Sequence, residues 1–260
     1  MLSSLPASFL WEDGVFETLR SEHRRVMDLD AHLDRLFESA HSIQLSLPSR
    51  EEIKETLRRE MKASPHPEAY VRLAFLRDRK RSRLFLIVQP AKRYPASLYE
   101  KGVTIRTSPT RRSAPSALDG QIKTKEFLNG LFATLDGLSS PGMFEEIYLD
   151  SDGYVTEGRT SNIFLKKGDA CLTPPGFLGV LKGITRQQVI REAGRLGSPA
   201  REEIFTRFNL YSAEEVFLTN TSMGVLPVVS IDGRTIGDGR VGAFTKKMIQ
   251  SIPRRKIHDA

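Results

Sequence analysis

A short segment in the second half of the chain has the properties of an anion-binding site. Gly183, Ile184 and Thr185 stand at the start of a predicted helix. The helix is predicted because apolar residues follow at helical spacing, at Val189, Ile190, Ala193 and Leu196. The first backbone N–H groups of a helix have no partner within it and favour a negative charge, and the Thr185 hydroxyl adds a donor. The segment therefore predicts an anion site, with ordinary helix capping by Thr185 as the alternative.

A second set of reactive side chains lies on a predicted strand, residues 70–76 (YVRLAFL). Alternate residues of a strand point to the same face, so Tyr70 and Arg72 share one. A buried arginine binds carboxylates through charge-assisted hydrogen bonds. The pair predicts either a carboxylate site or the solvated face of a strand, and both interpretations stay open.

The residue pattern predicts neither a metal site nor the active site of a common hydrolase. The sequence has no G-x-S-x-G, H-E-x-x-H or G-x-x-x-x-G-K-[ST] motif. Cys171 is the only cysteine, which excludes an internal disulfide and a multi-cysteine metal site. His23, His32 and His41 are close in sequence, and we expect them on exposed helix faces.

Three further motifs follow one another in a fixed order. They are residues 120–129 (GQIKTKEFLN), residues 153–164 (GYVTEGRTSNIF), and residues 172–174 (LTP) with 181–186 (LKGITR). In this order and spacing they resemble the signature of class IV aminotransferases, the fold type IV pyridoxal-phosphate (PLP) enzymes. That family includes branched-chain aminotransferases, D-amino-acid aminotransferases and 4-amino-4-deoxychorismate lyases. The resemblance extends from Asp13 to about Gly242, nearly the whole chain.

The resemblance implies how the cofactor, PLP, is held. Lys123 matches the catalytic lysine that forms the Schiff base; Lys125 is the obvious competitor but does not align with the motif. Glu157 matches the carboxylate that pairs with the protonated pyridine nitrogen. The phosphate would be bound by Arg35, Ile184, Thr185 and Thr221.

The resemblance also implies a set of substrate-binding residues: Phe16, Tyr70, Arg72 and Ser222. Tyr70 and Arg72 resemble the Tyr-x-Arg strand that lines the pocket of branched-chain aminotransferases. Arg106 and Arg111 are alternatives, because the D-amino-acid branch takes carboxylate-binding groups from that region. Residues 220–224 (NTSMG) resemble the lyase branch as much as the transaminases.

The implied reaction is amino transfer between an α-amino acid and a 2-oxo acid, with Lys123 moving the α-proton. The alternative enzyme is a 4-amino-4-deoxychorismate lyase that eliminates pyruvate. A net charge of +7 raises a third alternative, a basic nucleic-acid-binding protein. The most basic run, residues 77–83 (RDRKRSR), lies between two apolar runs without interleaved aromatic residues. We therefore expect no nucleic-acid partner.

The elements that must position these residues suggest a mixed α/β (α+β) chain of two domains. Residues 89–95 (QPAKRYP) contain two prolines and form the best linker candidate. We expect a small α/β domain over residues 1–94. A larger β-rich pseudo-barrel domain over residues 95–260 would carry the PLP lysine, with the cofactor between the two domains.

Local signals predict two helices in the first domain. Asp30 can cap a helix with an apolar stripe that includes Leu33 and Leu36, and Arg35 points away from this stripe, toward solvent or the inter-domain cleft. Ser49 and Glu52 form a capping-box pattern before the second helix.

Composition and termini bear on the cellular setting. The chain is 39% hydrophobic and 27% charged, as in ordinary globular proteins, and no apolar run is long enough to span a membrane. The first residues lack the basic and apolar regions of a secretory signal, and the lone cysteine suits a reducing compartment. We expect a cytoplasmic enzyme, and the resemblance implies a homodimer.

Overall fold

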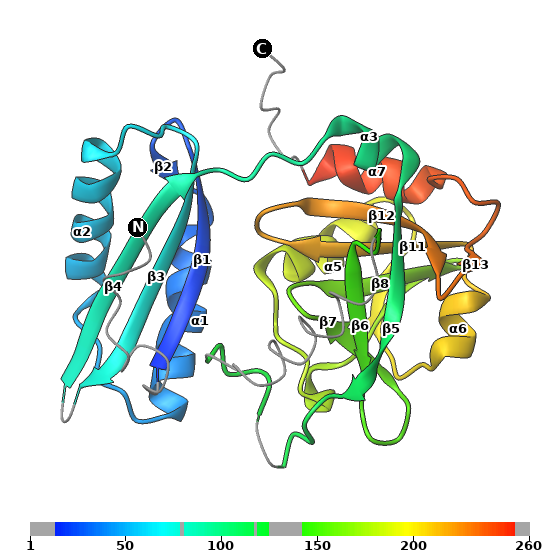
Figure 1. The fold of residues 1–260 in the computed structure, drawn as a ribbon, viewed down its shortest axis with the longest axis horizontal. Helices are drawn as coiled ribbons and strands as arrows, with labels where there is room; N and C mark the ends of the chain where they lie inside the picture. The colour runs from blue at the N-terminus through cyan, green and yellow to red at the C-terminus, as the bar shows by residue number, and fades with distance from the viewer. Residues whose placement is uncertain (1–13, 79–80, 117–118, 125–141, 253–260) are drawn as a thin grey trace. The chain divides into compact units, whose positions relative to one another are not determined.

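The computed structural model describes residues 14–78, 81–116, 119–124 and 142–252. The chain divides into two compact units, the first reaching Lys92 and the second beginning at Arg93 (Figure 1). This division falls inside the predicted linker. Residues 122–124 pack with the first unit, although the sequence predicted that Lys123 belongs to the larger domain. Lys123, the predicted Schiff-base lysine, is therefore supported by the smaller unit.

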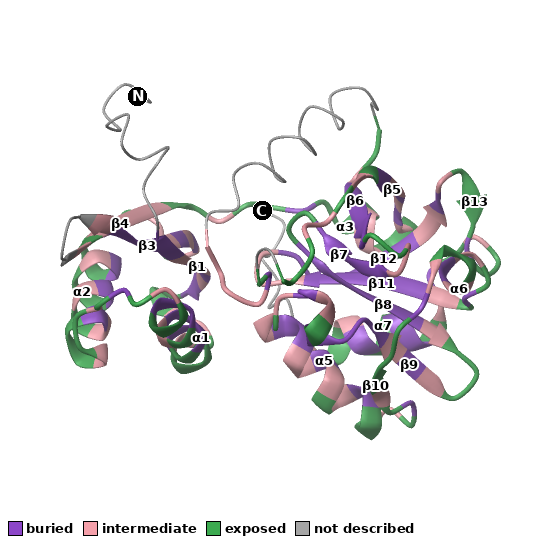
Figure 2. Ribbon diagram, turned by 90° about the horizontal axis from the view of Figure 1, so that it is seen from below, coloured by how far each residue is buried: buried purple, intermediate pink, exposed green. Residues whose placement is uncertain are grey.

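The first unit is a four-stranded antiparallel sheet covered by two helices on one face (Figure 2). Its strand order is β2-β1-β3-β4. The strands are β1 (Gly14–Glu22), β2 (Arg25–Val26), β3 (Ala69–Asp78) and β4 (Arg81–Pro90), and the helices are α1 (Leu29–Ser42) and α2 (Arg50–Ala63). Val15 and Leu19 of β1 are buried under the helices, so this face of the sheet carries the core.

The two helices begin at different kinds of cap. The capping box that Ser49 and Glu52 predict is confirmed at the start of α2. The prediction that Asp30 caps the first helix is wrong, because α1 begins at Leu29 after Asp28, which lies in the left-handed region. Asp30 stands in the first turn instead, where its charge suits the helix dipole.

The second unit is built on a nine-stranded mixed sheet, with the order β10-β9-β8-β11-β12-β5-β6-β7 and β13 paired to β12. The strands are β5 (Val103–Arg111), β6 (Glu145–Leu149), β7 (Val155–Gly158), β8 (Asn162–Lys167), β9 (Ala170–Thr173), β10 (Ala200–Glu202), β11 (Glu215–Asn220), β12 (Gly224–Ile231) and β13 (Arg234–Thr235). Only residues 159–161 separate β7 from β8, yet four strands lie between them in the sheet order. The sheet must therefore curl so that β7 comes back toward β8.

Both faces of this sheet are apolar, because alternate residues of its strands enter two different cores. Leu218 of β11 lies in one core, whereas Phe217 lies in the other and stacks on Phe164 with ring centroids 5.1 Å apart. Helices complete the unit: α3 (Ala96–Lys101), a 3₁₀ turn (Gly176–Leu178), α5 (Ile184–Arg195), α6 (Arg207–Tyr211) and α7 (Ala243–Ser251). The helix predicted after Gly183 is confirmed as α5.

The mixed α/β fold with a small and a large sheet is confirmed. Within the described residues, no helix has the length and apolar character to cross a membrane.

Candidate active site

The predicted site residues fall into two groups, one in each unit. The first group comprises Phe16, Arg35, Tyr70, Arg72 and Lys123, and the second comprises Glu157, Ile184, Thr185, Thr221 and Ser222.

The backbone of Lys123 is fixed from both sides in the first unit. Residues 122–124 return to the exposed edge of β1, where the Phe16 N–H donates to the Lys123 carbonyl at 3.1 Å. The Lys123 N–H donates to the Ser39 hydroxyl of α1, also at 3.1 Å. Lys123 is half-buried rather than a fully solvated surface lysine. Lys125, its competitor in the sequence, lies outside the described residues.

Phe16 connects Lys123 with Arg72. Its ring centroid lies 4.8 Å from the Lys123 ammonium nitrogen and 4.2 Å from the Arg72 guanidinium carbon. Thr18 pairs with Arg72 in the β1–β3 ladder, so Phe16 and Arg72 are diagonal neighbours on one face. Tyr70 is half-buried on the same face, as the strand alternation predicts. The first unit thus places a lysine, an arginine and an apolar ring side by side.

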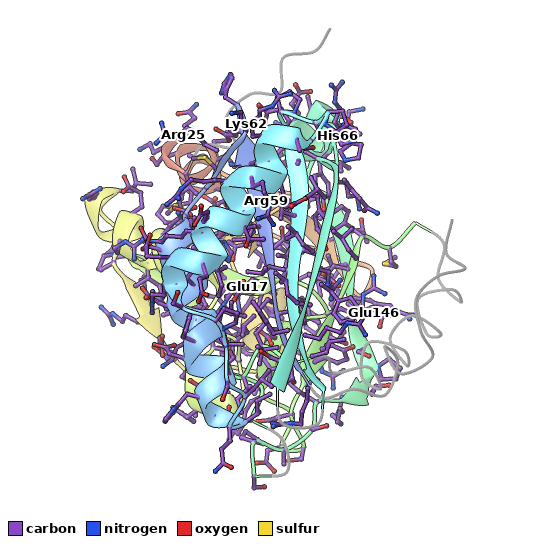
Figure 3. The ribbon with its side chains drawn as sticks, turned by 90° about the vertical axis from the view of Figure 1, so that its left-hand side faces the viewer. Glu17, Arg25, Arg59, Lys62, His66 and Glu146 are labelled. Carbon is purple, nitrogen blue, oxygen red and sulfur yellow. The ribbon has the colours of Figure 1, made fainter. Side chains whose placement is uncertain are left out.

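The opposite face of β1 carries a buried ion pair. Glu17 accepts two hydrogen bonds from Arg35, from Nε at 2.8 Å and from Nη2 at 2.7 Å, and its Oε2 lies 2.8 Å from His32 Nδ1. His32, Arg35 and Ser39 follow one another at spacings of three and four along α1, so they form one polar stripe. Figure 3 shows Glu17 on β1, whereas Arg59 and Lys62 project outward from α2.

One prediction about α1 is wrong, and one of two open alternatives for it is excluded. Arg35 is not directed to solvent, because it is buried against Glu17 on the neighbouring strand. His32 is not on an exposed helix face, since only 1% of it is accessible. The spacing of apolar residues does not reveal this polar stripe, because its partner, Glu17, lies on β1.

The charge of Glu17 is strongly favoured in the folded protein. Burial by itself raises the pKa of the carboxyl group, but the hydrogen bonds from His32 and Arg35 and the charges of Arg35 and Lys123 outweigh it and lower the pKa to about 2. Glu17 therefore holds Arg35 in a fixed orientation and contributes negative charge near Lys123.

We predict that Glu17→Gln destabilises the protein and removes part of its acid sensitivity. The folded pKa of Glu17 lies below its ordinary 4.5, so its contribution is complete above pH 4.5 and is lost as the pH falls toward 2. The difference between the ordinary and the folded pKa corresponds to roughly 3 kcal/mol of unfolding free energy. Urea unfolding of both proteins between pH 7 and 3 measures it. If the unfolding free energies of the two proteins changed in parallel with pH, the lowered pKa of Glu17 would be contradicted.

The second group is centred on Glu157 of β7. This carboxylate is 6% exposed, so Glu157 is not a solvated residue on the surface of a hairpin. Its Oε2 accepts from the Asn162 amide at 2.9 Å and from the Leu181 N–H at 3.0 Å, and its Oε1 lies 2.9 Å from Arg112 Nη2. Three donors from different segments hold the carboxylate in place.

The N-terminus of α5 lies next to this carboxylate in the hydrogen-bond network. Gly183 is its cap and Thr185 is buried in its first turn. Helix α7 also begins after a glycine, and there the Glu215 carboxylate accepts from the Phe244 and Thr245 N–H groups at 3.0 and 2.7 Å. No corresponding carboxylate caps α5 within the described part of the chain. The start of α5 therefore suits an external anion.

Thr221 and Ser222 lie in a tight turn between β11 and β12. The Asn220 side chain fixes this turn, because its Oδ1 accepts from the N–H groups of Ser222 and Met223 at 2.9 and 2.8 Å. Both predicted residues are half-buried. The turn can present two neighbouring hydroxyl groups to a ligand.

The alternative carboxylate-binding residues are placed differently. Arg106 forms a close ion pair with the buried Glu146, and Arg111 is exposed at the end of β5. Sequence reasoning missed Arg112 and gave no role to Asn162, although both contact Glu157. Asn162 stands inside the second motif, which could have identified it, whereas Arg112 lies in an irregular segment without a motif.

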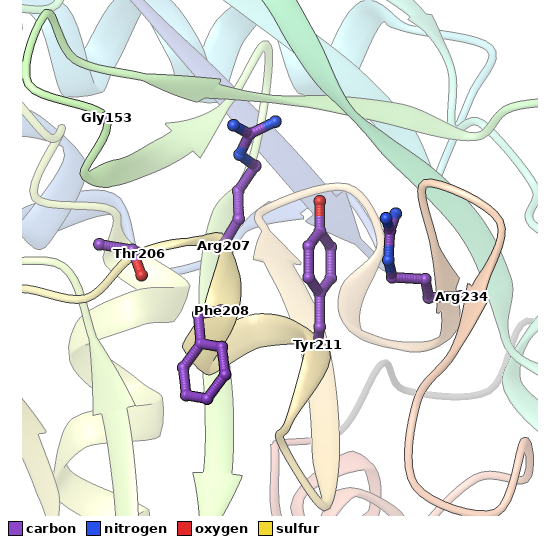
Figure 4. A pocket seen from close by; sticks show the side chains of 6 residues that line it. All are labelled: Gly153, Thr206, Arg207, Phe208, Tyr211 and Arg234. Atoms are coloured by element: carbon purple, nitrogen blue, oxygen red, sulfur yellow. The ribbon is translucent and has the colours of Figure 1, made fainter.

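A surface hollow of about 450 Å³ lies elsewhere in the second unit (Figure 4). It is lined by Gly153, Thr206, Arg207, Phe208, Tyr211 and Arg234. None of the predicted site residues lines it. Tyr211 donates to Asp232 at 2.6 Å, and its burial together with this bond raises the pKa of its hydroxyl group. We assign the hollow no part in the chemistry.

The sequence matches one known family over most of its length. Residues 14–231 match the family model of amino-transferase class IV. The chain belongs to the class IV aminotransferases. Members of this family depend on PLP. This chain is an aminotransferase, which transfers an amino group between an α-amino acid and a 2-oxo acid. The similarity favours neither the lyase nor the nucleic-acid-binding alternative.

Similar proteins agree with this family assignment. The Pseudomonas aeruginosa branched-chain-amino-acid aminotransferase is 33% identical to this class IV aminotransferase over 251 residues, which cover 90% of this chain and 81% of the relative. The crystal structure of the Escherichia coli branched-chain amino acid aminotransferase superposes with a TM-score of 0.84 at 30% identity, covering 92% and 84% of the two chains. The branched-chain aminotransferase of the archaeon Thermoproteus uzoniensis, solved with norvaline, gives 0.86 at 28% identity, covering 96% and 89%.

Proposed function

We propose that this aminotransferase binds PLP and acts on amino acids with branched apolar side chains. The observation that carries the substrate proposal is the contact of Phe16 with both Arg72 and Lys123. A substrate of this class needs a cation for its carboxylate, an apolar surface for its side chain and a base for its α-proton. Arg72, Phe16 and Lys123 supply these three functions in one place.

The residues present fit the cofactor. PLP, when bound, supplies an electron-withdrawing ring that stabilises the charge left when the bond between Cα and its hydrogen breaks. Lys123 is the proposed covalent attachment point and moves the α-proton. Glu157 holds the proton on the pyridine nitrogen, because its buried carboxylate favours a positive charge beside it.

The proposed phosphate ligands come from the anion-favouring positions of each unit. In the second unit they are the first-turn N–H groups of α5, the Thr185 hydroxyl and Thr221. In the first unit Arg35 is the proposed ligand, and its pair with Glu17 fixes the orientation of the guanidinium group. The pairing means that Arg35→Ala would also leave a buried carboxylate unpaired, so Arg35 is a poor position for a clean test.

We predict that Thr185→Val weakens PLP binding by roughly fivefold to tenfold, because one hydroxyl donor to the phosphate is lost. Valine keeps the shape of the side chain. Thr245→Val is the matched control, since Thr245 is also buried in the first turn of a glycine-capped helix whose N–H groups already bind Glu215. Equilibrium dialysis measures both variants. Equal affinities for the wild type and Thr185→Val would remove Thr185 from the phosphate site.

A single-turnover titration tests the proposed reaction and substrate. The PLP-loaded enzyme is mixed with one amino acid at a time, without a 2-oxo acid, and its absorption spectrum is followed. Leucine, isoleucine and valine should leave pyridoxamine phosphate, whereas glycine and lysine should react much more slowly. A lyase would instead return to its initial spectrum. Preference for a D-amino acid or a cationic side chain would contradict the substrate proposal.

We also propose that the enzyme is a cytoplasmic homodimer. The resemblance to the family and the single buried cysteine, Cys171, support this setting. Light scattering during size-exclusion chromatography would give the mass of the assembly.

A further inference from the structure

Asn162, the first residue of β8, connects two parts of the proposed cofactor site. Its amide nitrogen donates to Glu157 Oε2 and to the Leu181 carbonyl, each at 2.9 Å. The Leu181 N–H donates to the same Glu157 oxygen at 3.0 Å. Leu181 stands two residues before Gly183, the cap of α5. One side chain therefore joins the carboxylate of β7 to the loop that leads into the helix.

The hydrogen bonds at position 162 require a side chain that donates to two acceptors, as asparagine can. Both partners of the amide nitrogen are acceptors, a carboxylate and a backbone carbonyl, and the amide group has two N–H donors for them. Reversing the amide would place its oxygen against both acceptors, so its orientation is determined. Aspartate has the same shape but no donor when charged.

The amide oxygen lies against Gly183. A Cβ atom at position 183 would overlap Asn162 Oδ1, and Arg186 Cβ would be 3.3 Å from it. The backbone at Gly183 is extended with φ −60°, which any residue can adopt, so the need for glycine is one of space. Asn162 therefore contacts the loop at both Leu181 and Gly183.

We propose that Asn162 is a positioning residue that fixes Glu157 relative to the start of α5. The inference rests on the proposed function, in which Glu157 serves the pyridine nitrogen and α5 serves the phosphate. These two sites must keep a fixed separation, because PLP is a rigid ring with its phosphate on a short arm. Asn162 helps to set this separation through its hydrogen bonds to Glu157 and Leu181, beside the bond from the Leu181 N–H to Glu157.

The first test is Asn162→Asp, followed as PLP affinity between pH 8.5 and pH 6. At pH 8.5 two carboxylates would face each other, and PLP should bind roughly tenfold more weakly than to the wild type. As the pH falls, a proton shared between the new carboxylate and that of Glu157 relieves their repulsion, so the ratio to the wild-type affinity should shrink. A loss of equal size at both pH values, or no loss, would overturn the proposal.

Asn209→Asp is the matched control for charge. Asn209 Oδ1 accepts from the Thr206 N–H in the capping box of α6, and aspartate keeps that acceptor. PLP affinity of this variant should equal that of the wild type at both pH values.

The second test is independent of the folding of Asn162→Asp. Gly183→Ala should weaken PLP binding by roughly tenfold in the wild-type background, because the added methyl group displaces the Asn162 side chain. In an Asn162→Ala background the overlap with Oδ1 is gone and the 3.3 Å contact with Arg186 Cβ remains, so the same change should cost much less. Gly194→Ala is the control, since a Cβ there meets no atom within 4 Å. If the loss of PLP affinity in the double variant equals the product of the losses in the two single variants, the proposal is overturned.

The two proposals can fail separately. If the wild-type protein does not bind PLP, the proposed function fails. If the wild type binds PLP and the changes at 162 and 183 act independently, the proposed function stands and the positioning role of Asn162 fails.

Discussion

Lys123→Ala is expected to lower turnover by roughly 10²–10⁴-fold or more, because it removes the group that we propose moves the α-proton. It should also remove the covalent bond between protein and cofactor. The fold should persist, since the Lys123 backbone makes the contacts with Phe16 and Ser39 and alanine retains them. Single-turnover and steady-state rates, measured beside urea unfolding, separate the catalytic loss from a structural one.

Lys54→Ala provides the matched control within the first unit. Lys54 forms an ion pair with Asp30 at 2.7 Å on the helical surface, and an exposed pair contributes little to stability. Turnover of this variant should stay near that of the wild type. If Lys123→Ala retained a comparable rate, Lys123 would have no part in proton transfer.

Glu157→Gln is expected to lower kcat by about 10²–10³-fold, the usual cost of removing one preorganised electrostatic group. The amide keeps an oxygen that can accept from Asn162 and Leu181, although its NH₂ group then faces Arg112 and cannot accept from it. The negative charge that we propose to pair with the pyridine nitrogen is lost, and Arg112 loses its ionic partner. PLP should still bind, because the phosphate ligands are untouched.

Glu146→Gln is the comparison for this variant. Glu146 is also buried and also paired with an arginine, Arg106, within the second unit. This change should lower stability but leave kcat within a few-fold of the wild type. Near-normal turnover in Glu157→Gln, or equal losses in the two variants, would show that Glu157 has only a structural role.

The parts of the fold with local signals were predictable from the sequence. The capping box of Ser49 and Glu52 places its two partners three residues apart, so the start of α2 can be identified without tertiary information. The same holds for α5, whose apolar spacing and glycine lie in one segment. The order of the three motifs predicted the family, which the match over residues 14–231 confirms.

The polar contacts between distant segments could not be predicted in this way. Arg35 and His32 are buried because Glu17 lies 18 and 15 residues away on β1, and no local pattern reveals that pairing. Residues 122–124 pack with the first unit because they complete the edge of β1, long after the chain has left that unit at Lys92. Arg112 reaches Glu157 across 45 residues of chain.

The position of the covalent bond to PLP tests the central claim most directly. The PLP-loaded protein is reduced with borohydride, which makes the bond permanent, and its peptides are then mapped by mass spectrometry. The phosphopyridoxyl label should be found on Lys123. A label on Lys125, or no label on either lysine, would contradict the assignment of Lys123 as the residue that carries the cofactor.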